Sequence, residues 1–190
     1  MKPINICAAL LAPITLAVAA PACAQPASWT VDKSQSSVGF SGKHAGQDFN
    51  GKFGTWDAVI VFDPADLAHS SAKVTFQTST AKTGNDMEDE ALGQEEWLNP
   101  AKFPTAIFTS TQITSAGGNN YVAKGMIALK GKTLPVSLDF TLAISGNKAT
   151  MKGSATVNRL AYDIGTQSDP NGTFVSQDIG ITVDLVATKK

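Results

Sequence analysis

Apolar and polar residues alternate along much of the chain after Ser36, with a repeat of two residues. The alternation is clearest over residues 134–145, where Leu, Val, Leu, Phe, Leu and Ile occupy every second position. This pattern is typical of antiparallel strands that bury one face and expose the other, so the chain is predicted to be all-β. Shorter stretches of the same kind occur at residues 38–40, 49–53, 59–61, 74–76 and 179–185.

Short clusters rich in Gly, Asn, Asp and Pro separate these stretches. Gly and Asn tolerate positive φ, and Pro presets a turn entry. The segments between the clusters number about eight, which is the number of strands that closes a barrel wide enough for side chains or one ligand. Gly39, Gly125 and Gly153 lie within predicted strands and fit the bends that closure requires. The sequence thus predicts an eight-stranded antiparallel barrel, with turns at residues 44–48, 63–66, 117–120, 130–132 and 145–148.

Residues 83–98 depart from the strand pattern. The segment is acidic, lacks β-branched residues after Thr83, and places Met87, Ala91 and Leu98 on nearly one helical face. Asn99-Pro100 is expected to end it, because proline disfavours helix in the residue before it. We therefore predict a short helical insertion of one or two helices.

The first 24 residues have the features of a secretory signal peptide. Lys2 precedes an apolar run from Ile4 to Ala20, and Ala22-Cys23-Ala24 supplies the small residues of a cleavage site. The run is interrupted by Pro13 and is shorter than the roughly 20 apolar residues that span a bilayer. We expect cleavage near Ala24, export to the periplasm, and one mature domain over residues 25–190.

Cys23 leaves a second interpretation open. Lipoproteins are cut just before a cysteine that receives the lipid anchor, and Pro21-Ala22 is a poor version of that context. Cleavage at Ala24 instead removes both cysteines, Cys7 and Cys23, so that the mature chain has no thiol for a disulfide, a nucleophile or a metal site.

Charge and chemistry narrow the function further. The formal net charge is −1 and Arg159 is the only arginine, which gives no basic face for nucleic acid or an acidic membrane. The histidines, His44 and His69, lack paired-ligand spacing for zinc, and no serine lies in a Gly-x-Ser-x-Gly elbow. The acidic residues of 86–96 lack calcium-loop spacing, so a solvated helix face explains them better. No catalytic residue, metal site or cofactor is predicted.

The apolar strand faces point either to a filled core or to a ligand cavity. Periodicity shows that large side chains face inward, but it does not show whether they meet in the middle or line a tunnel. On composition alone the two alternatives are about equally favoured.

Four groups of motifs, in order along the chain, resemble the YceI family of exported lipid- or polyisoprenoid-binding proteins. They are the hairpin-like residues 37–44 with 51–53, the segment 89–108 with its Phe-Pro-Thr-Ala-Ile-Phe, the Gly-Lys-Thr-Leu-Pro-Val of 131–136, and the Asn-Arg segment of 157–165. The resemblance implies a lipocalin-like barrel with a helix-bearing insertion around an extended isoprenoid or other long acyl chain.

Two departures from the family pattern concern polar groups. Glu88-Asp89 stands where the family often has Arg-Asp, which removes any head-group contact from that arginine. Residues 162–165 replace an aromatic-Gly pair after the Asn-Arg segment, which leaves the register there open.

We expect nine apolar side chains to line the tunnel and three polar side chains to contact a head group at its mouth. The tunnel residues are Phe40, Phe53, Phe76, Phe108, Met126, Val136, Leu138, Phe140 and Leu142. The mouth residues are His44, Arg159 and Tyr162.

The function predicted is a periplasmic, non-enzymatic protein that holds a polyisoprenoid, an isoprenoid quinone or a fatty-acid-like chain as carrier, buffer or sensor. An inner-membrane protein is a further partner in this interpretation. The alternative is an exported scaffold barrel that binds a protein through its outer face, which an exposed apolar patch on the outside would favour.

Overall fold

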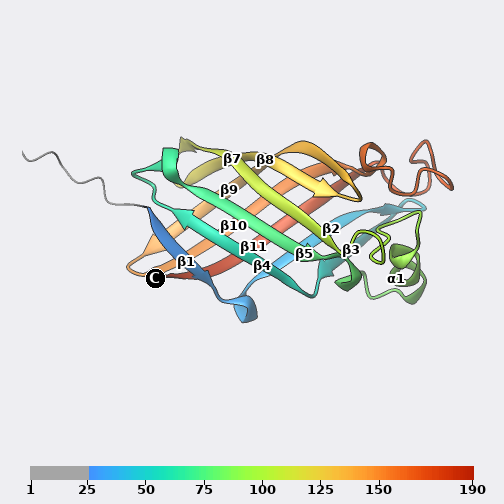
Figure 1. The fold of residues 1–190 in the computed structure, drawn as a ribbon, viewed down its shortest axis with the longest axis horizontal. Coiled ribbons are helices and arrows are strands. Elements are labelled where there is room, and N and C mark those ends of the chain that lie inside the picture. The colour runs from blue at the N-terminus through green and yellow to red at the C-terminus, as the bar shows by residue number, and fades with distance from the viewer. Residues whose placement is uncertain (1–25) are drawn as a thin grey trace, which may run out of the picture.

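Eight antiparallel strands close into a barrel in the computed structural model, which describes residues 26–190 (Figure 1). Closure occurs because β1 pairs with β4 on one side and with β11 on the other. The predicted signal peptide and the alternative anchor at Cys23 lie outside the described residues. In ring order the strands are β1 (Ala27–Val31), β4 (Trp56–Phe62), β5 (Ser71–Gln77), β7 (Thr105–Gly117), β8 (Asn120–Leu129), β9 (Lys132–Ser145), β10 (Lys148–Asn158) and β11 (Asp178–Lys189).

Three further strands extend the sheet at one end of the barrel. β2 (Ser37–His44) pairs with β11, β3 (Gln47–Phe53) pairs with β2, and β6 (Ala81–Lys82) pairs with β3. The helix α1 (Asp86–Gly93) and the loop after β10 lie at this same end, opposite the end where β1 begins and β11 finishes (Figure 1). The predicted fold, an eight-stranded antiparallel barrel with a short helical insertion, is confirmed.

The helix ends earlier than predicted. Asn85 caps its first turn by accepting hydrogen bonds from the backbone N–H groups of Met87 and Glu88. The helix stops at Gly93 rather than at Asn99-Pro100, because the chain turns back there and the N–H of Leu98 donates to the carbonyl of Leu92 at 3.1 Å. Short 3-10 helices form at four other turns: Lys33–Gln35, Leu67–His69, Thr78–Thr80 and Arg159–Tyr162. Within residues 26–190, no helix has the length and apolarity needed to cross a membrane.

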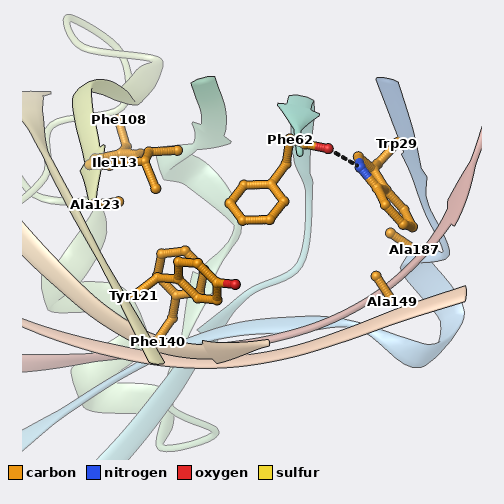
Figure 2. Close-up of a cluster of buried hydrophobic side chains, with 9 residues drawn as sticks. All are labelled: Trp29, Phe62, Phe108, Ile113, Tyr121, Ala123, Phe140, Ala149 and Ala187. Carbon is orange, nitrogen blue, oxygen red and sulfur yellow. Dashed lines mark hydrogen bonds between the residues drawn. The ribbon is translucent and has the colours of Figure 1, made fainter. Parts of the chain in front are cut away.

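A cluster of buried side chains occupies the barrel toward the end where β1 begins and β11 finishes. Figure 2 shows these side chains, which come from β1, β4 and β7 to β11, gathered in the interior of the barrel. Tyr121 stacks on Phe140 with ring centroids 5.4 Å apart and meets the ring of Phe62 edge-on at 5.4 Å. The indole N–H of Trp29 donates to the carbonyl of Phe62 at 3.0 Å, which joins β1 to β4 and satisfies the one polar atom of that side chain.

Candidate ligand cavity

The interior of the eight-stranded ring contains an apolar cavity of about 180 Å³, which we call chamber 1. Its wall consists of aromatic and aliphatic side chains from all eight strands, and Ser71 is the only hydroxyl-bearing residue among them. The barrel is therefore not completely filled by its own side chains. An apolar space of this kind favours hydrocarbon over water, which finds no hydrogen-bond partners there.

A second cavity of about 320 Å³, chamber 2, lies at the end of the barrel that carries α1. Phe40, Phe49 and Leu98 form part of its apolar wall, and α1 contributes Met87 and Leu92. The two chambers are adjacent, because four residues line both of them. These shared residues are Phe53, Leu129, Val157 and Ile181.

Eight of the nine predicted tunnel residues line one chamber or both. Phe40 lines chamber 2 and Phe53 lines both. The other six line chamber 1: Phe76, Phe108, Val136, Leu138, Phe140 and Leu142.

Met126 differs from its predicted position. Its neighbours Ala123, Ile127 and Leu129 line chamber 1, whereas Met126 lines neither chamber. Successive side chains of a strand point to opposite faces, so Met126 lies on the outer face of β8. The expectation that it faces the interior was one residue out of register.

Several cavity residues were not predicted. Trp29 lines chamber 1 from β1, which has only five residues and shows too little alternation to reveal its inward face. Trp56 and Met151 line the same chamber, and Met87 lines chamber 2. The helical face that joins Met87, Ala91 and Leu98 in the sequence was the available signal, since all three line chamber 2.

Arg159 lies in the wall of chamber 2, but its hydrogen-bond donors are all paired with acceptors of the protein. Its side chain is only 2% exposed, and its guanidinium lies 5.7 Å from the centre of the Trp97 ring. A guanidinium has five N–H donors. They donate to the carbonyls of Ser176, Ile164, Gly165 and Val175, and at 2.6 Å to the carboxylate of Asp169.

Asp169 completes this arrangement beneath the loop that follows β10. Its carboxylate accepts hydrogen bonds from the N–H groups of Val175 at 2.8 Å, Thr173 at 2.8 Å and Phe174 at 3.1 Å. These bonds, that from Val175 foremost, lower the pKa of Asp169 to about 2, although burial alone would raise it. Arg159 and Asp169 together hold the loop over the mouth of chamber 2.

His44 and Glu88 connect β2 to α1 across the mouth of chamber 2. Nδ1 of His44 lies 2.9 Å from the Glu88 carboxylate, and the carboxylate accepts this hydrogen bond. The His44 ring also lies 5.7 Å from the ring of Phe174. His44 thus contacts both segments that cover this end of the barrel.

Tyr162 lies in the wall of chamber 2 and is 2% exposed. Its hydroxyl donates to the carbonyl of Ile127 over 3.5 Å, well beyond the roughly 2.7–2.8 Å typical of O–H···O hydrogen bonds. Burial raises the pKa of Tyr162, so the hydroxyl stays uncharged. The three predicted mouth residues therefore line the same chamber. They differ in how many of their hydrogen-bonding atoms are already paired within the protein.

The described residues include no group of three or more His, Cys, Asp or Glu side chains placed to hold a metal ion. His69 is exposed, lies 2.8 Å from Asp66 within one turn, and lines neither chamber.

A closed antiparallel barrel around an apolar cavity defines a lipocalin-like protein, and the comparisons specify the family. The model of the YceI-like domain matches residues 29–187, so the chain belongs to this family. The UPF0312 protein of Pseudomonas syringae pv. tomato is 30% identical over 175 residues, covering 87% of this chain and 90% of that protein.

Solved structures agree with this assignment. The crystal structure of Burkholderia cenocepacia BcnA is 31% identical, with a TM-score of 0.80 over 84% of this chain and all of that one. A polyisoprenoid-binding domain from Saccharophagus degradans has a TM-score of 0.65 and covers 85% of this chain and 98% of that domain. At 12% identity, the second likeness shows the shared fold alone.

Proposed function

We propose that this protein binds a long apolar lipid of the isoprenoid type inside its barrel and does not catalyse a reaction. The observation that carries the proposal is the pair of adjacent chambers. Apart from Ser71 in chamber 1, their polar side chains are confined to chamber 2, at the end of the barrel that carries α1. A lipid with a long tail and a small head has the same distribution of polarity. The polyisoprenoid-binding name of the Saccharophagus degradans neighbour supports this ligand class.

Hydrophobic burial supplies enough free energy for such binding. Each Å² of apolar surface withdrawn from water contributes roughly 25 cal/mol, so a tail buried in both chambers binds without a charged contact. Aromatic and aliphatic walls recognise a hydrocarbon by its shape and length, and the few polar groups at the mouth recognise its head.

The place of action that we propose is the periplasm, on the strength of the signal-peptide pattern in residues 1–24. There the barrel shields a membrane lipid from water as a carrier, and an inner-membrane protein is the natural partner for loading or unloading it. The mouth at α1 is where we place the exchange.

The scaffold alternative is less well supported by the surface. Four large apolar side chains are strongly exposed among the described residues: Val59, Met87, Ile144 and Phe174. Met87 and Ile144 line the two chambers, and Phe174 packs near His44 at the mouth. Of these four strongly exposed side chains, only Val59 lies on the outer wall away from the chambers, and a single exposed side chain does not form an apolar binding patch.

The direct test is native mass spectrometry of the mature protein purified from its own periplasm, followed by lipid extraction. The expected result is an additional mass of several hundred daltons or more that is released on denaturation and has an isoprenoid signature. A bare protein that also stays bare after incubation with isoprenoid quinones and polyprenols would contradict the proposal and favour the scaffold.

A further inference from the structure

The polar side chains around chamber 2 restrict the head group that a bound lipid can carry, provided that the barrel binds a lipid as proposed. Within the described part of the chain, Arg159 is the only lysine or arginine that lines this chamber. Besides Trp97, whose indole carries one N–H donor, the polar side chains of the wall are His44, Thr83, Asn85, Glu88, Arg159 and Tyr162.

Arg159 cannot serve as the counter-charge of an anionic head group. Its five donors already have acceptors, and its charge is compensated by Asp169 at 2.6 Å. Turning the guanidinium toward a ligand would break the hydrogen bonds that hold the loop after β10 and would leave Asp169 buried without its cation, which is strongly unfavourable.

Glu88 makes the chamber unfavourable for a second negative charge. Its carboxylate lies in the wall with a side chain only 21% exposed, and its partner in the chamber is His44. Nδ1 of His44 is engaged by this carboxylate, which leaves Nε2 as the ring nitrogen that can meet a ligand, and in a neutral imidazole with its proton on Nδ1 that nitrogen carries a lone pair. A lone pair accepts a hydrogen bond from a hydroxyl but repels a phosphate oxygen.

Asn85 and Thr83 have their oxygens engaged at the start of α1. Asn85 accepts from the backbone of Met87 at 3.0 Å, and the Thr83 hydroxyl donates to Asp89 at 3.2 Å. Tyr162 is the exception, because its hydroxyl makes only the long contact of 3.5 Å with Ile127. This buried hydroxyl can both donate to and accept from a ligand oxygen.

We propose that the lipid of this barrel has an uncharged, oxygen-bearing head group, an alcohol or a carbonyl, which Tyr162 and His44 recognise while Glu88 disfavours a phosphate or carboxylate. An anionic head group would lose its hydration on entering this partly buried site. The site has no free cation to compensate that loss, and the Glu88 carboxylate would repel the incoming charge. An uncharged head loses much less solvation and finds a donor and acceptor in Tyr162.

The test compares three isoprenoids by competition against a fluorescent lipid: a polyprenol, the polyprenyl phosphate with the same tail, and an isoprenoid quinone. The expected result is that the polyprenol and the quinone bind roughly tenfold or more tightly than the phosphate. Equal or tighter binding of the phosphate would overturn the inference and leave the lipid-binding function intact. Binding of none of the three would overturn the lipid-binding function itself.

Variants of Glu88 identify the source of the discrimination. Glu88→Gln keeps an acceptor for His44 and removes the negative charge. It should therefore reduce the difference in affinity between the polyprenol and the polyprenyl phosphate. Glu88→Lys should shift the ratio of phosphate affinity to polyprenol affinity roughly tenfold toward the phosphate. Glu90→Lys is the matched control, because Glu90 is exposed on the same helix and does not line chamber 2. An equal effect of both lysine variants would assign the discrimination to general charge and contradict the role of Glu88.

Tyr162→Phe tests the head-group contact separately. It should weaken polyprenol binding severalfold and leave a headless isoprenoid hydrocarbon unaffected. Equal weakening of both ligands would show that Tyr162 only shapes the chamber.

Discussion

The ring of Phe108 lies against the backbone of β8 at Gly125, where no other residue has room. A Cβ atom at this position would lie 2.5 Å from the Phe108 ring and 2.5 Å from the carbonyl oxygen of Thr109. Gly51 accommodates the ring of Phe40 in the same way, at 2.3 Å. These glycines let aromatic walls of the chambers approach the sheet, a reason for glycine beyond the bends that the sequence suggested for Gly125.

Gly125→Ala should therefore destabilise the barrel by about 1–3 kcal/mol, because one of the two close contacts is with backbone that cannot move aside. The measurement is the free energy of unfolding in urea. Gly54→Ala is the control, since its nearest neighbours would be 3.6 Å away, an ordinary contact. Equal stability of the two variants would contradict the proposed packing role.

Asp169 gives a prediction about acid stability. Its pKa is about 2 in the folded protein against an ordinary 3.8, so the ionised carboxylate stabilises the folded state. This contribution is complete above about pH 5, declines as the pH falls below the ordinary pKa of 3.8, and is mostly lost near pH 2.

Asp169→Asn removes the titration and keeps the size of the side chain. The wild type should be clearly more stable than this variant at pH 5, and the difference should shrink as the pH approaches 2. Urea unfolding at both pH values measures it, and carboxylates common to the two proteins cancel. A difference that is independent of pH would show that the charge of Asp169 does not stabilise the loop.

At the scale of elements, α1 acts as a cover of chamber 2 rather than as part of the barrel wall. It is held by its cap at Asn85 and by the His44–Glu88 contact, and its Met87 side chain is 78% exposed although it lines the chamber. An element with few buried contacts opens more readily than the barrel does.

Asn85→Ala should loosen this cover. Loss of an N-cap costs about 1 kcal/mol, which is enough to raise the population of the open form severalfold. We expect faster release of a bound fluorescent lipid and faster amide exchange at Met87 and Glu88, with little change in the melting of the barrel. Asn147→Ala, in the exposed hairpin at the opposite end, is the control. An unchanged release rate would show that the lipid leaves by another route.

The elements also show what the sequence could and could not predict. Alternation with a period of two is a direct consequence of strand geometry, and it therefore located the long strands and many of the side chains that line the chambers. It could not determine which residues of β8 face the interior, and the prediction that Met126 lines the tunnel is therefore wrong. It also could not show that the donors of Arg159 are satisfied by carbonyls 5 to 17 residues away, because that depends on how the loop folds.

At the scale of the whole molecule, the barrel contains two adjacent chambers with a common boundary. A tail that enters at α1 reaches chamber 1 only by passing Phe53, Leu129, Val157 and Ile181. Tail length should therefore influence affinity in two stages, because a short tail fills chamber 2 and a long one gains burial in chamber 1 as well.

Val157→Trp should separate these stages by closing the boundary. Val157 lines chamber 2 as well, so binding of a short prenol should weaken somewhat. Affinity for a long polyprenol should fall at least about tenfold further, or about 1.4 kcal/mol, because the part of its tail buried in chamber 1 is lost. Displacement of a fluorescent lipid measures both affinities.

Val59→Trp is the matched control for this experiment. It adds the same side chain on the outer wall, where Val59 is 68% exposed and lines neither chamber, so both affinities should match the wild type. A long polyprenol that binds Val157→Trp as tightly as the wild type would mean that its tail does not pass between the chambers. The two cavities would then be separate sites, and chamber 1 would be a packing void of the barrel.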